Sequence, residues 1–256
     1  MNRTGILVCG HGSRKEEGVR GLLDFAQRLQ EYRPEYIVSS CFLDLSQPDF
    51  ATAAEKLYQQ GIRHIIAAPA FLFGGMHVNY ELPTQIAECC ARLTDLQIVL
   101  AEYISISEQV VKLCAENIGQ VSTHSDFVRR HRQCLITVGA GTSLSSANGD
   151  VAKLTRMVWE ECGFGMAQYS FVSRATFPLV QDMLRMAEQM GFDEIVILPL
   201  MFFPGVYTDK IYLAAEEFRL TSTVKVTIAE TLGTNDLLIE AISIRIDCAL
   251  VELGIF

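Results

Sequence analysis

The sequence predicts an α/β protein built from two tandem copies of one domain, each a parallel four-stranded sheet flanked by helices. Two observations lead to this prediction: short apolar segments alternate with amphipathic ones, and the pattern of the first half recurs in the second. Hydrophobic residues make up 50% of the 256 residues and charged residues 20%, so the chain can bury a sizeable core. At about 150 residues per domain, the length also fits two small domains.

The two halves can be laid over each other with an offset of about 130 residues. The turn Gly10–Ser13 after a first apolar run matches Gly139–Thr142 after a second. The further matched pairs are Pro48 and Pro178, Gly61 and Gly191, Pro69 and Pro199, and Gly75 and Gly205. This series indicates a duplicated domain, with copies expected at residues 1–123 and 131–256. The polar segment around 120–133, which holds Arg129, Arg130 and Arg132, is the expected boundary.

The elements follow from the local pattern. In the first copy, short apolar segments rich in β-branched residues predict strands near 5–9, 36–43, 64–71 and 96–101. Amphipathic stretches between them predict helices near 14–32, 49–60, 82–93 and 105–119. The second copy repeats the strands near 134–139, 167–172, 193–200 and 224–229. Nearly continuous apolar strands indicate parallel sheets covered on both faces.

The expected strand order is the common flavodoxin-like order 2-1-3-4. In such a sheet, ligands bind beyond the carboxyl ends of the strands, between the first and the third. The residues after these two strands are therefore the candidates for function.

Composition disfavours several functions. Thirty acidic against 21 basic residues give a net charge of −9, which disfavours broad nucleic-acid binding. No apolar run reaches the ~18 residues needed to span a membrane and no signal-peptide pattern is found, so we expect a cytoplasmic protein without a membrane anchor. The eight cysteines form no CxxC pair and are expected to be mostly buried free thiols, which disfavours structural zinc or an iron–sulfur cluster.

His11 lies in the turn that follows the first expected strand. Glycines on both sides of it permit a tight turn and a close backbone approach. Ser13 and Glu16 have the spacing of a capping box, so we expect a helix to begin there.

His77 follows the third strand, in the loop before a helix whose first turn Pro83 is expected to occupy. The topology brings His77 and His11 to the same point of the sheet. Imidazole binds divalent first-row metals and is a base near neutral pH. Asp44, at the end of the second strand, could add a carboxylate. The alternative for each is ordinary: a histidine bonded to a backbone carbonyl, or an aspartate that caps a helix or faces solvent.

The second copy lacks all three side chains. At the corresponding positions it has Ala140, Tyr207 and Arg174. We therefore expect the first copy to carry the chemistry and the second, with its degenerate site, to form a wall of the substrate cleft.

The segments Val8–Arg14, Phe42–Pro48 and Pro69–Pro83 together resemble the class II chelatases of the CbiX/SirB family. The resemblance covers both halves and implies two chelatase-like domains. It implies a lyase that inserts Fe2+ or Co2+ into sirohydrochlorin for siroheme or cobalamin, with the metal as a substrate and no permanently bound cofactor. It further implies that His11 and His77 bind the metal and accept protons, with Asp44 where the family usually has glutamate.

The required chemistry agrees with this resemblance. Metal insertion must remove the pyrrole protons and deliver a partly desolvated cation, and paired imidazoles can do both. No phosphate-binding P-loop motif is found, so insertion is expected not to use ATP. Sirohydrochlorin carries carboxylates that basic side chains and helix N-termini can bind. The expected substrate contacts are Ser13, Arg14, Lys15, Gly75, Tyr207 and Lys210.

The activity should depend on pH. The histidines must be neutral to bind a metal, so activity should fall as pH drops through about 6.5. If Asp44 faces the histidines, it favours their protonated form and moves this fall to higher pH.

Two other function classes remain open. A histidine phosphatase also places a histidine after its first strand, but with an arginine immediately before it, where this chain has Gly10. A metal carrier or tetrapyrrole-binding protein of the same fold would bind without inserting. The physiological metal, iron, cobalt or nickel, is also open. A duplicated chain can do alone what a half-length relative does as a dimer, so we expect a monomer.

Overall fold

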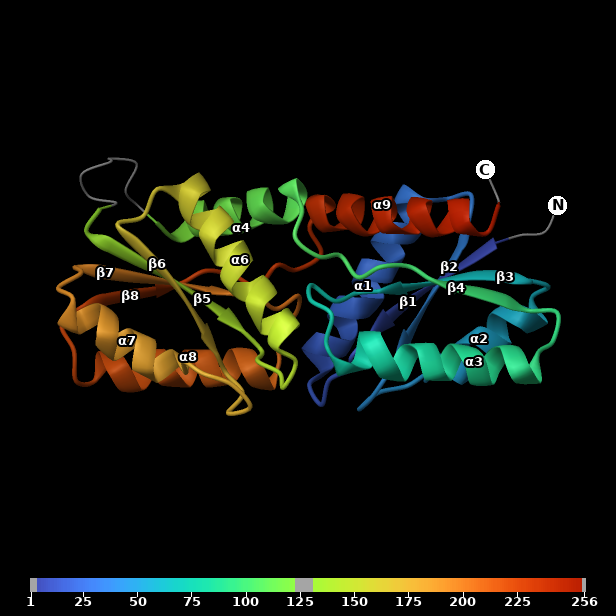
Figure 1. The fold of residues 1–256 in the computed structure, drawn as a ribbon, viewed down its shortest axis with the longest axis horizontal. Helices are drawn as coiled ribbons and strands as arrows, with labels where there is room; N and C mark the ends of the chain where they lie inside the picture. Colours follow the sequence, from blue (N-terminus) through green and yellow to red (C-terminus); the bar gives the residue numbers. More distant parts are fainter. Residues whose placement is uncertain (1–3, 123–130, 255–256) are drawn as a thin grey trace. The chain divides into compact units, whose positions relative to one another are not determined.

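The computed structural model describes residues 4–122 and 131–254, which form two parallel four-stranded sheets flanked by helices (Figure 1). The first sheet has the order β2-β1-β3-β4, with β1 (Thr4–Gly10), β2 (Ile37–Phe42), β3 (His64–Pro69) and β4 (Gln97–Leu100). The second has the order β6-β5-β7-β8, with β5 (Gln133–Gly139), β6 (Met166–Phe171), β7 (Glu194–Pro199) and β8 (Lys225–Ile228). The predicted fold class and strand order are confirmed.

Helices connect the strands in both sheets. Those that follow the strands of the first sheet are α1 (Glu16–Tyr32), α2 (Phe50–Gln59), the short π-helix η1 (His77–Glu81) with α3 (Leu82–Arg92), and α4 (Glu108–Val121). Those of the second are α6 (Ser145–Cys162), α7 (Val180–Gln189), α8 (Val206–Arg219) and α9 (Asp236–Glu252).

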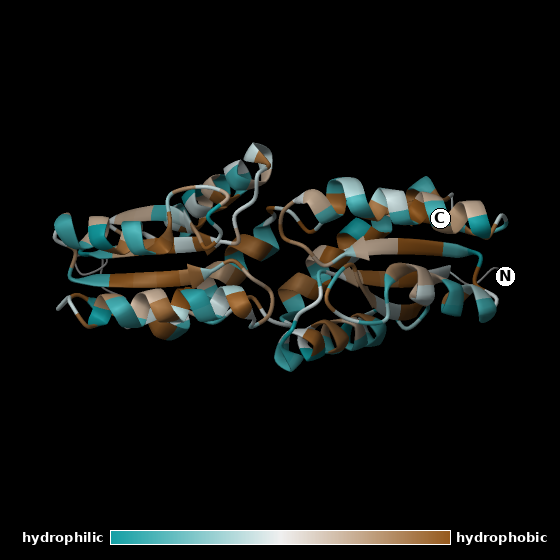
Figure 2. Ribbon diagram, turned by 90° about the horizontal axis from the view of Figure 1, so that it is seen from below, coloured by the Kyte–Doolittle hydropathy of each residue, from teal (hydrophilic) through white to brown (hydrophobic). Residues whose placement is uncertain are grey.

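The central strands explain the apolar pattern of the sequence. Every residue of β1 and β5 is buried, because helices cover both faces of each sheet. Figure 2 shows hydrophobic residues concentrated in the strands, while the helices alternate between hydrophobic and hydrophilic residues. In the first sheet, α2 and α3 cover one face through residues such as Phe50, Leu57 and Leu82. The candidate residues thus follow directly after strands that are buried in the core.

The compact units of the structure do not coincide with the sequence repeats. One unit comprises Met1–Ser105 and Thr234–Phe256, and the other Ile106–Gly233. Helix α9, which ends the second repeat, packs against α1, β3 and β4, whereas α4, which ends the first repeat, packs against α6 and β7. The expected segments 1–123 and 131–256 therefore differ from the observed units, because the last helix of each repeat packs against the sheet of the other repeat. The expected boundary residues Arg129 and Arg130 lie outside the described residues.

Polar contacts add to the apolar packing of α9 on the first sheet. The half-buried guanidinium of Arg33 donates to Ser243 Oγ at 2.6 Å and pairs with Asp247 at 2.8 Å. Burial acts to lower the pKa of Arg33, but the carboxylates of Asp247 and Glu35 outweigh it and raise this pKa. Arg245 of α9 pairs with Glu102 at 2.8 Å, just beyond β4. The exchanged helix is therefore an integral part of the unit that carries both histidines.

Two composition-based expectations can be compared with the structure. Six of the eight cysteines are buried as free thiols, whereas Cys90 is half-buried and Cys248 is exposed on α9. Within residues 4–122 and 131–254, no helix combines the length and the apolar character that crossing a membrane requires.

Candidate functional site

The loop that carries His11 is held in place by the segment after β2. The N–H of Leu43 donates to the carbonyl of Gly10 at 2.9 Å, and the N–H of Asp44 donates to the carbonyl of His11 at 2.9 Å. Gly12 has a φ of +96°, and a Cβ there would lie 1.9 Å from the Asp44 carbonyl oxygen. Only glycine fits this close approach, so the two loops are fixed against each other.

Ser13 closes the loop by a different contact from the one expected. Its N–H donates to Ser46 Oγ at 3.1 Å, and that hydroxyl donates back to the Ser13 carbonyl at 3.0 Å. Its own hydroxyl accepts from the N–H of Lys15 at 3.0 Å. Helix α1 begins at Glu16 with Lys15 as its N-cap and without a side-chain cap, so the predicted capping box is wrong. The serine forms a local turn and fastens it to the loop after β2.

His77 begins a helix, whereas the sequence analysis expected it in the loop before one. The π-helical turn η1 runs directly into α3, and the N–H of Leu82 donates to the carbonyl of His77. Pro83 lies in the first turn of α3, as predicted. A proline clashes with the carbonyl four residues earlier in an α-helix, and the wider π turn moves that carbonyl away. The backbone can therefore stay helical for one turn before Pro83. In the sequence, the proline indicated only where a helix begins, so this turn was not predicted.

The structure brings His11 and His77 together, as the topology predicts. Their ring centroids lie 4.4 Å apart with the planes tilted by 41°. Within the described part of the chain, His11 Nδ1 is buried and has no hydrogen-bond partner. His77 Nδ1 lies 2.7 Å from Glu81 Oε2, and the His77 side chain is 30% exposed. One imidazole is thus oriented by a carboxylate, and the other is desolvated beside it.

The environment lowers the pKa of His11. Burial is the largest cause, because it disfavours the charged form of the imidazole. The neighbouring His77 is the next, because its own positive charge would repel a second one. Asp44 and Glu81 raise the pKa of His11, but by less. Asp44 therefore raises the pKa of His11, as expected, but the net shift of this pKa is downward. His11 is neutral near pH 7 and keeps a lone pair for a metal or a proton.

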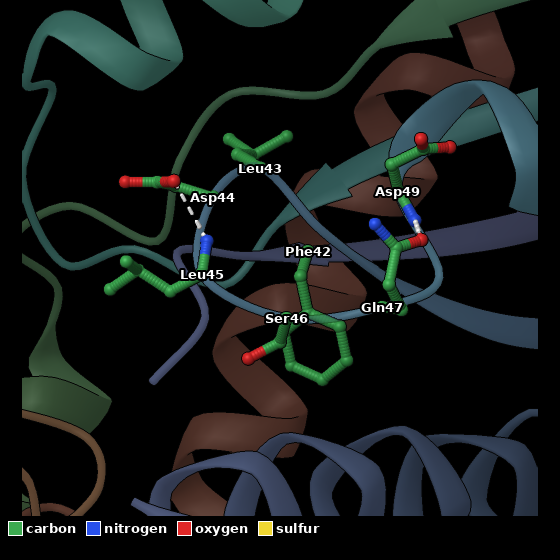
Figure 3. Close-up of a pocket in the computed structure, with 7 residues that line it drawn as sticks. All are labelled: Phe42, Leu43, Asp44, Leu45, Ser46, Gln47 and Asp49. Atoms are coloured by element: carbon green, nitrogen blue, oxygen red, sulfur yellow. Dashed lines mark hydrogen bonds between the residues drawn. The ribbon is translucent and has the colours of Figure 1, made fainter. Parts of the chain in front are cut away.

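Asp44 is exposed and its carboxylate accepts from the N–H of Leu45 at 2.8 Å. Figure 3 shows this contact among the residues that line a pocket, whose volume is about 330 Å3. The pocket is lined by Phe42, Leu43, Asp44, Leu45, Ser46, Gln47 and Asp49, so it includes neither histidine. Among residues 4–122 and 131–254, no three His, Cys, Asp or Glu side chains are grouped closely enough to hold a metal. Of the three predicted residues, the structure brings the two histidines together, and Asp44 is not grouped with them closely enough to form a three-ligand site.

The predicted substrate contacts fall into two groups. Arg14 is exposed and Lys15 is half-buried at the start of α1, beside the His11 loop. Gly75 is partly exposed just before His77, and nothing lies within 4 Å of the position that a Cβ would take. In the other unit, Lys210 Nζ lies 5.5 Å from the centroid of the Tyr207 ring, and both side chains are exposed on α8.

Sequence reasoning missed Glu81. The spacing of four residues from His77 is the signal that could have found it, because such residues meet on one side of a helix. This spacing is informative only within a helix, and the sequence analysis places His77 in a loop.

The fold and the site together define a class of protein. It is a duplicated α/β protein with parallel sheets, in which one repeat carries paired imidazoles beyond its strand ends and the other repeat lacks them. Its family can be named: the chain belongs to the CbiX family, whose model matches residues 5–121 and 134–249. The two matched segments are the two sequence repeats, which confirms the duplication and the resemblance.

Relatives and solved structures agree with this assignment. The sirohydrochlorin ferrochelatase of Priestia megaterium is 24% identical over 251 residues, covering 97% of this chain and 91% of the relative. The sirohydrochlorin cobaltochelatase of the same organism is 24% identical over 216 residues, covering 84% of this chain and 69% of the relative. The structure of SirB from Bacillus subtilis with Fe3+ matches with a TM-score of 0.85 and 21% identity, covering 98% of each chain. At that identity the structural match establishes the fold.

Proposed function

We propose that this chain inserts Fe2+ or Co2+ into sirohydrochlorin without ATP. The observation that carries the proposal is the direct contact between the rings of His11 and His77 at the carboxyl ends of β1 and β3, in a chain of the CbiX family. The names of its relatives supply the substrate and the two metals.

The pair suits a metal that must be released. A four-ligand cage would retain the cation, whereas two imidazoles hold it with open positions that the macrocycle can fill. The absence of a third grouped ligand among the described residues is consistent with such transient binding. As the ring nitrogens of the macrocycle take over the metal, they must lose their protons.

His11 is suited to accept such a proton. Its lowered pKa means that the imidazole is neutral at the start. The nearby carboxylates of Asp44 and Glu81 would stabilise the imidazolium once it forms. We assign Asp44 this electrostatic role, and direct binding of the metal by Asp44 remains a prediction.

Local positive charge would hold the macrocycle despite the net charge of −9. We propose that Arg14 and Lys15 bind its carboxylates, assisted by the backbone near Ser13 and Gly75. Tyr207 and Lys210 of the second repeat are proposed as further contacts, with the aromatic ring on the macrocycle and the ammonium on a carboxylate. A monomeric state and a cytoplasmic location remain predictions, the first of which light scattering tests directly.

The decisive experiment is an anaerobic insertion assay. Purified protein is mixed with sirohydrochlorin and with Fe2+, Co2+ or Ni2+ in turn, and the absorption spectrum of the macrocycle is followed over the uncatalysed background. We expect acceleration by the wild type, and a loss of at least about a hundredfold in His11→Ala and His77→Ala. Glu160→Ala, on an exposed ion pair of α6, is the matched control and should leave the rate unchanged.

Two outcomes would replace the proposal. Metal binding without any spectral change of the macrocycle would indicate a carrier or tetrapyrrole-binding protein. Turnover of a generic phosphomonoester that disappears in His11→Ala would indicate a histidine phosphatase.

A further inference from the structure

Glu81 is a charged side chain in direct contact with His77. It lies at the end of η1, exposed to solvent, with its Oε2 at 2.7 Å from His77 Nδ1. A contact of this length between an imidazole and a carboxylate is a charge-assisted hydrogen bond. The carboxylate can only accept, so Nδ1 must carry the hydrogen.

The backbone builds this contact. In the π turn, residues 77 and 81 lie on the same side of the helix, and Pro83 directly after it favours the wide turn. The side chains therefore meet without any contribution from the rest of the sheet. The carboxylate also acts on the second ring of the pair, since it raises the pKa of His11.

The second repeat provides an internal comparison. About 130 residues further along, the positions of His77 and Glu81 are occupied by Tyr207 and Ile211. Ile211 is fully buried on α8, so this position belongs to the core in the repeat that lacks the histidine. The carboxylate is present only where there is an imidazole for it to orient.

We propose that Glu81 is a positioning residue that holds His77 in the Nδ1–H tautomer, so that the lone pair on Nε2 is presented to the incoming divalent cation. The fixed tautomer matters because an imidazole can offer a metal only the nitrogen that carries no hydrogen. A carboxylate on the far nitrogen also makes the metal-binding nitrogen more basic, and removing such a partner typically weakens metal binding by about 10–100-fold. This role rests on the proposed function only in one respect, namely that the bound cation is the one inserted into the macrocycle.

The test measures the tautomer and the metal affinity separately from insertion. The ring nitrogens of His77 are assigned by nitrogen NMR in the metal-free protein, and Co2+ affinity is obtained from a spectroscopic titration. We expect wild-type His77 to carry its hydrogen on Nδ1. In Glu81→Ala, the Nε2–H form should become populated and the Co2+ dissociation constant should rise by about 10–100-fold. Glu81→Gln should lie between them, because an amide can either accept from Nδ1–H or donate to Nδ1.

Controls separate positioning from folding. Glu81→Gln keeps the length of the side chain and its helix propensity, so a tautomer change in this variant is not an effect of unfolding. Glu88→Ala removes an exposed carboxylate from α3, which directly follows η1, and should change neither readout. The proposal is overturned if wild-type His77 carries its hydrogen on Nε2, or if both Glu81 variants keep the wild-type tautomer and Co2+ affinity. A protein that inserts no metal into sirohydrochlorin but still shows these effects of Glu81 would refute the proposed function and leave this inference intact.

Discussion

Replacing Gly12 by alanine should disturb both stability and metal binding, because two separate costs meet at this position. The φ of +96° is one that L side chains rarely adopt, and placing a Cβ in the left-handed region costs about 1–2 kcal/mol. The new Cβ would also lie 1.9 Å from the Asp44 carbonyl oxygen, and overpacking of this kind costs about 1–3 kcal/mol. Alanine stiffens the unfolded chain, which offsets about 0.4–1 kcal/mol. The expected net loss is about 2–4 kcal/mol.

Gly61→Ala is the matched control for the backbone cost. Gly61 has a similar φ of +87°, but nothing lies within 4 Å of where its Cβ would be. It should lose about 1 kcal/mol or less, so the difference between the two variants isolates the clash with the Asp44 loop. At about 4 °C per kcal/mol, thermal unfolding followed by circular dichroism should shift by about 8–16 °C for Gly12→Ala and by at most about 4 °C for Gly61→Ala.

The loop can relieve the clash by moving, and the assay includes this case. Such a movement breaks the hydrogen bond from Asp44 N–H to the His11 carbonyl and displaces the imidazole. The stability loss is then smaller, but Co2+ binding should weaken while Gly61→Ala binds normally. Equal melting temperatures and equal Co2+ affinities for the two variants would refute the reasoning.

Four further predictions concern the site and the exchanged helix. Tyr207→Phe should leave kcat for insertion within about threefold of the wild type, because the tyrosine replaces the histidine in the repeat without the pair; a loss as large as that of a histidine variant would contradict this. The kcat/KM profile should fall in acid through a pKa below 6.5, since burial and His77 lower the pKa of His11 and only its neutral form binds metal. Asp44→Asn removes a charge that raises this pKa, so the fall should move to lower pH under controlled metal speciation, and an unchanged profile would show that Asp44 is electrostatically remote. Arg33→Ala should cost about 1–3 kcal/mol, mainly by leaving the buried Ser243 hydroxyl without its donor, and hydrogen exchange should show weaker protection of α9; unchanged protection would refute the contact.

The sheets and the histidine pair could be predicted because they depend on local patterns and one topological rule. Short apolar runs define the strands, and the order 2-1-3-4 places the ends of β1 and β3 side by side. The sequence alone therefore predicts that His11 and His77 lie together. The duplication made this stronger, because the same pattern occurs twice and only one copy has the histidines.

What the sequence could not provide depended on backbone details or on nonlocal packing. The start of the helix at His77 was hidden by Pro83, which is compatible with either a loop or a π turn before it, and Glu81 was missed as a consequence. The capping-box spacing at Ser13 was real, but the serine had a competing partner in Ser46, far away in the sequence. The exchange of α4 and α9 could not be predicted, because two copies of one sheet present similar surfaces to either helix.

The exchanged helices have a consequence for the order in which the chain folds during synthesis. The unit Ile106–Gly233 is continuous in sequence, so all of its parts have been made once residue 233 has been added. The first sheet is made earlier, yet the face that α9 covers must wait, because Arg33 and Ser243 are separated by 210 residues. Folding domain by domain from the N-terminus is the usual order on the ribosome. Here we expect the order to be inverted. The unit that lacks the histidines is completed first, and the unit that carries them is completed only when α9 has emerged.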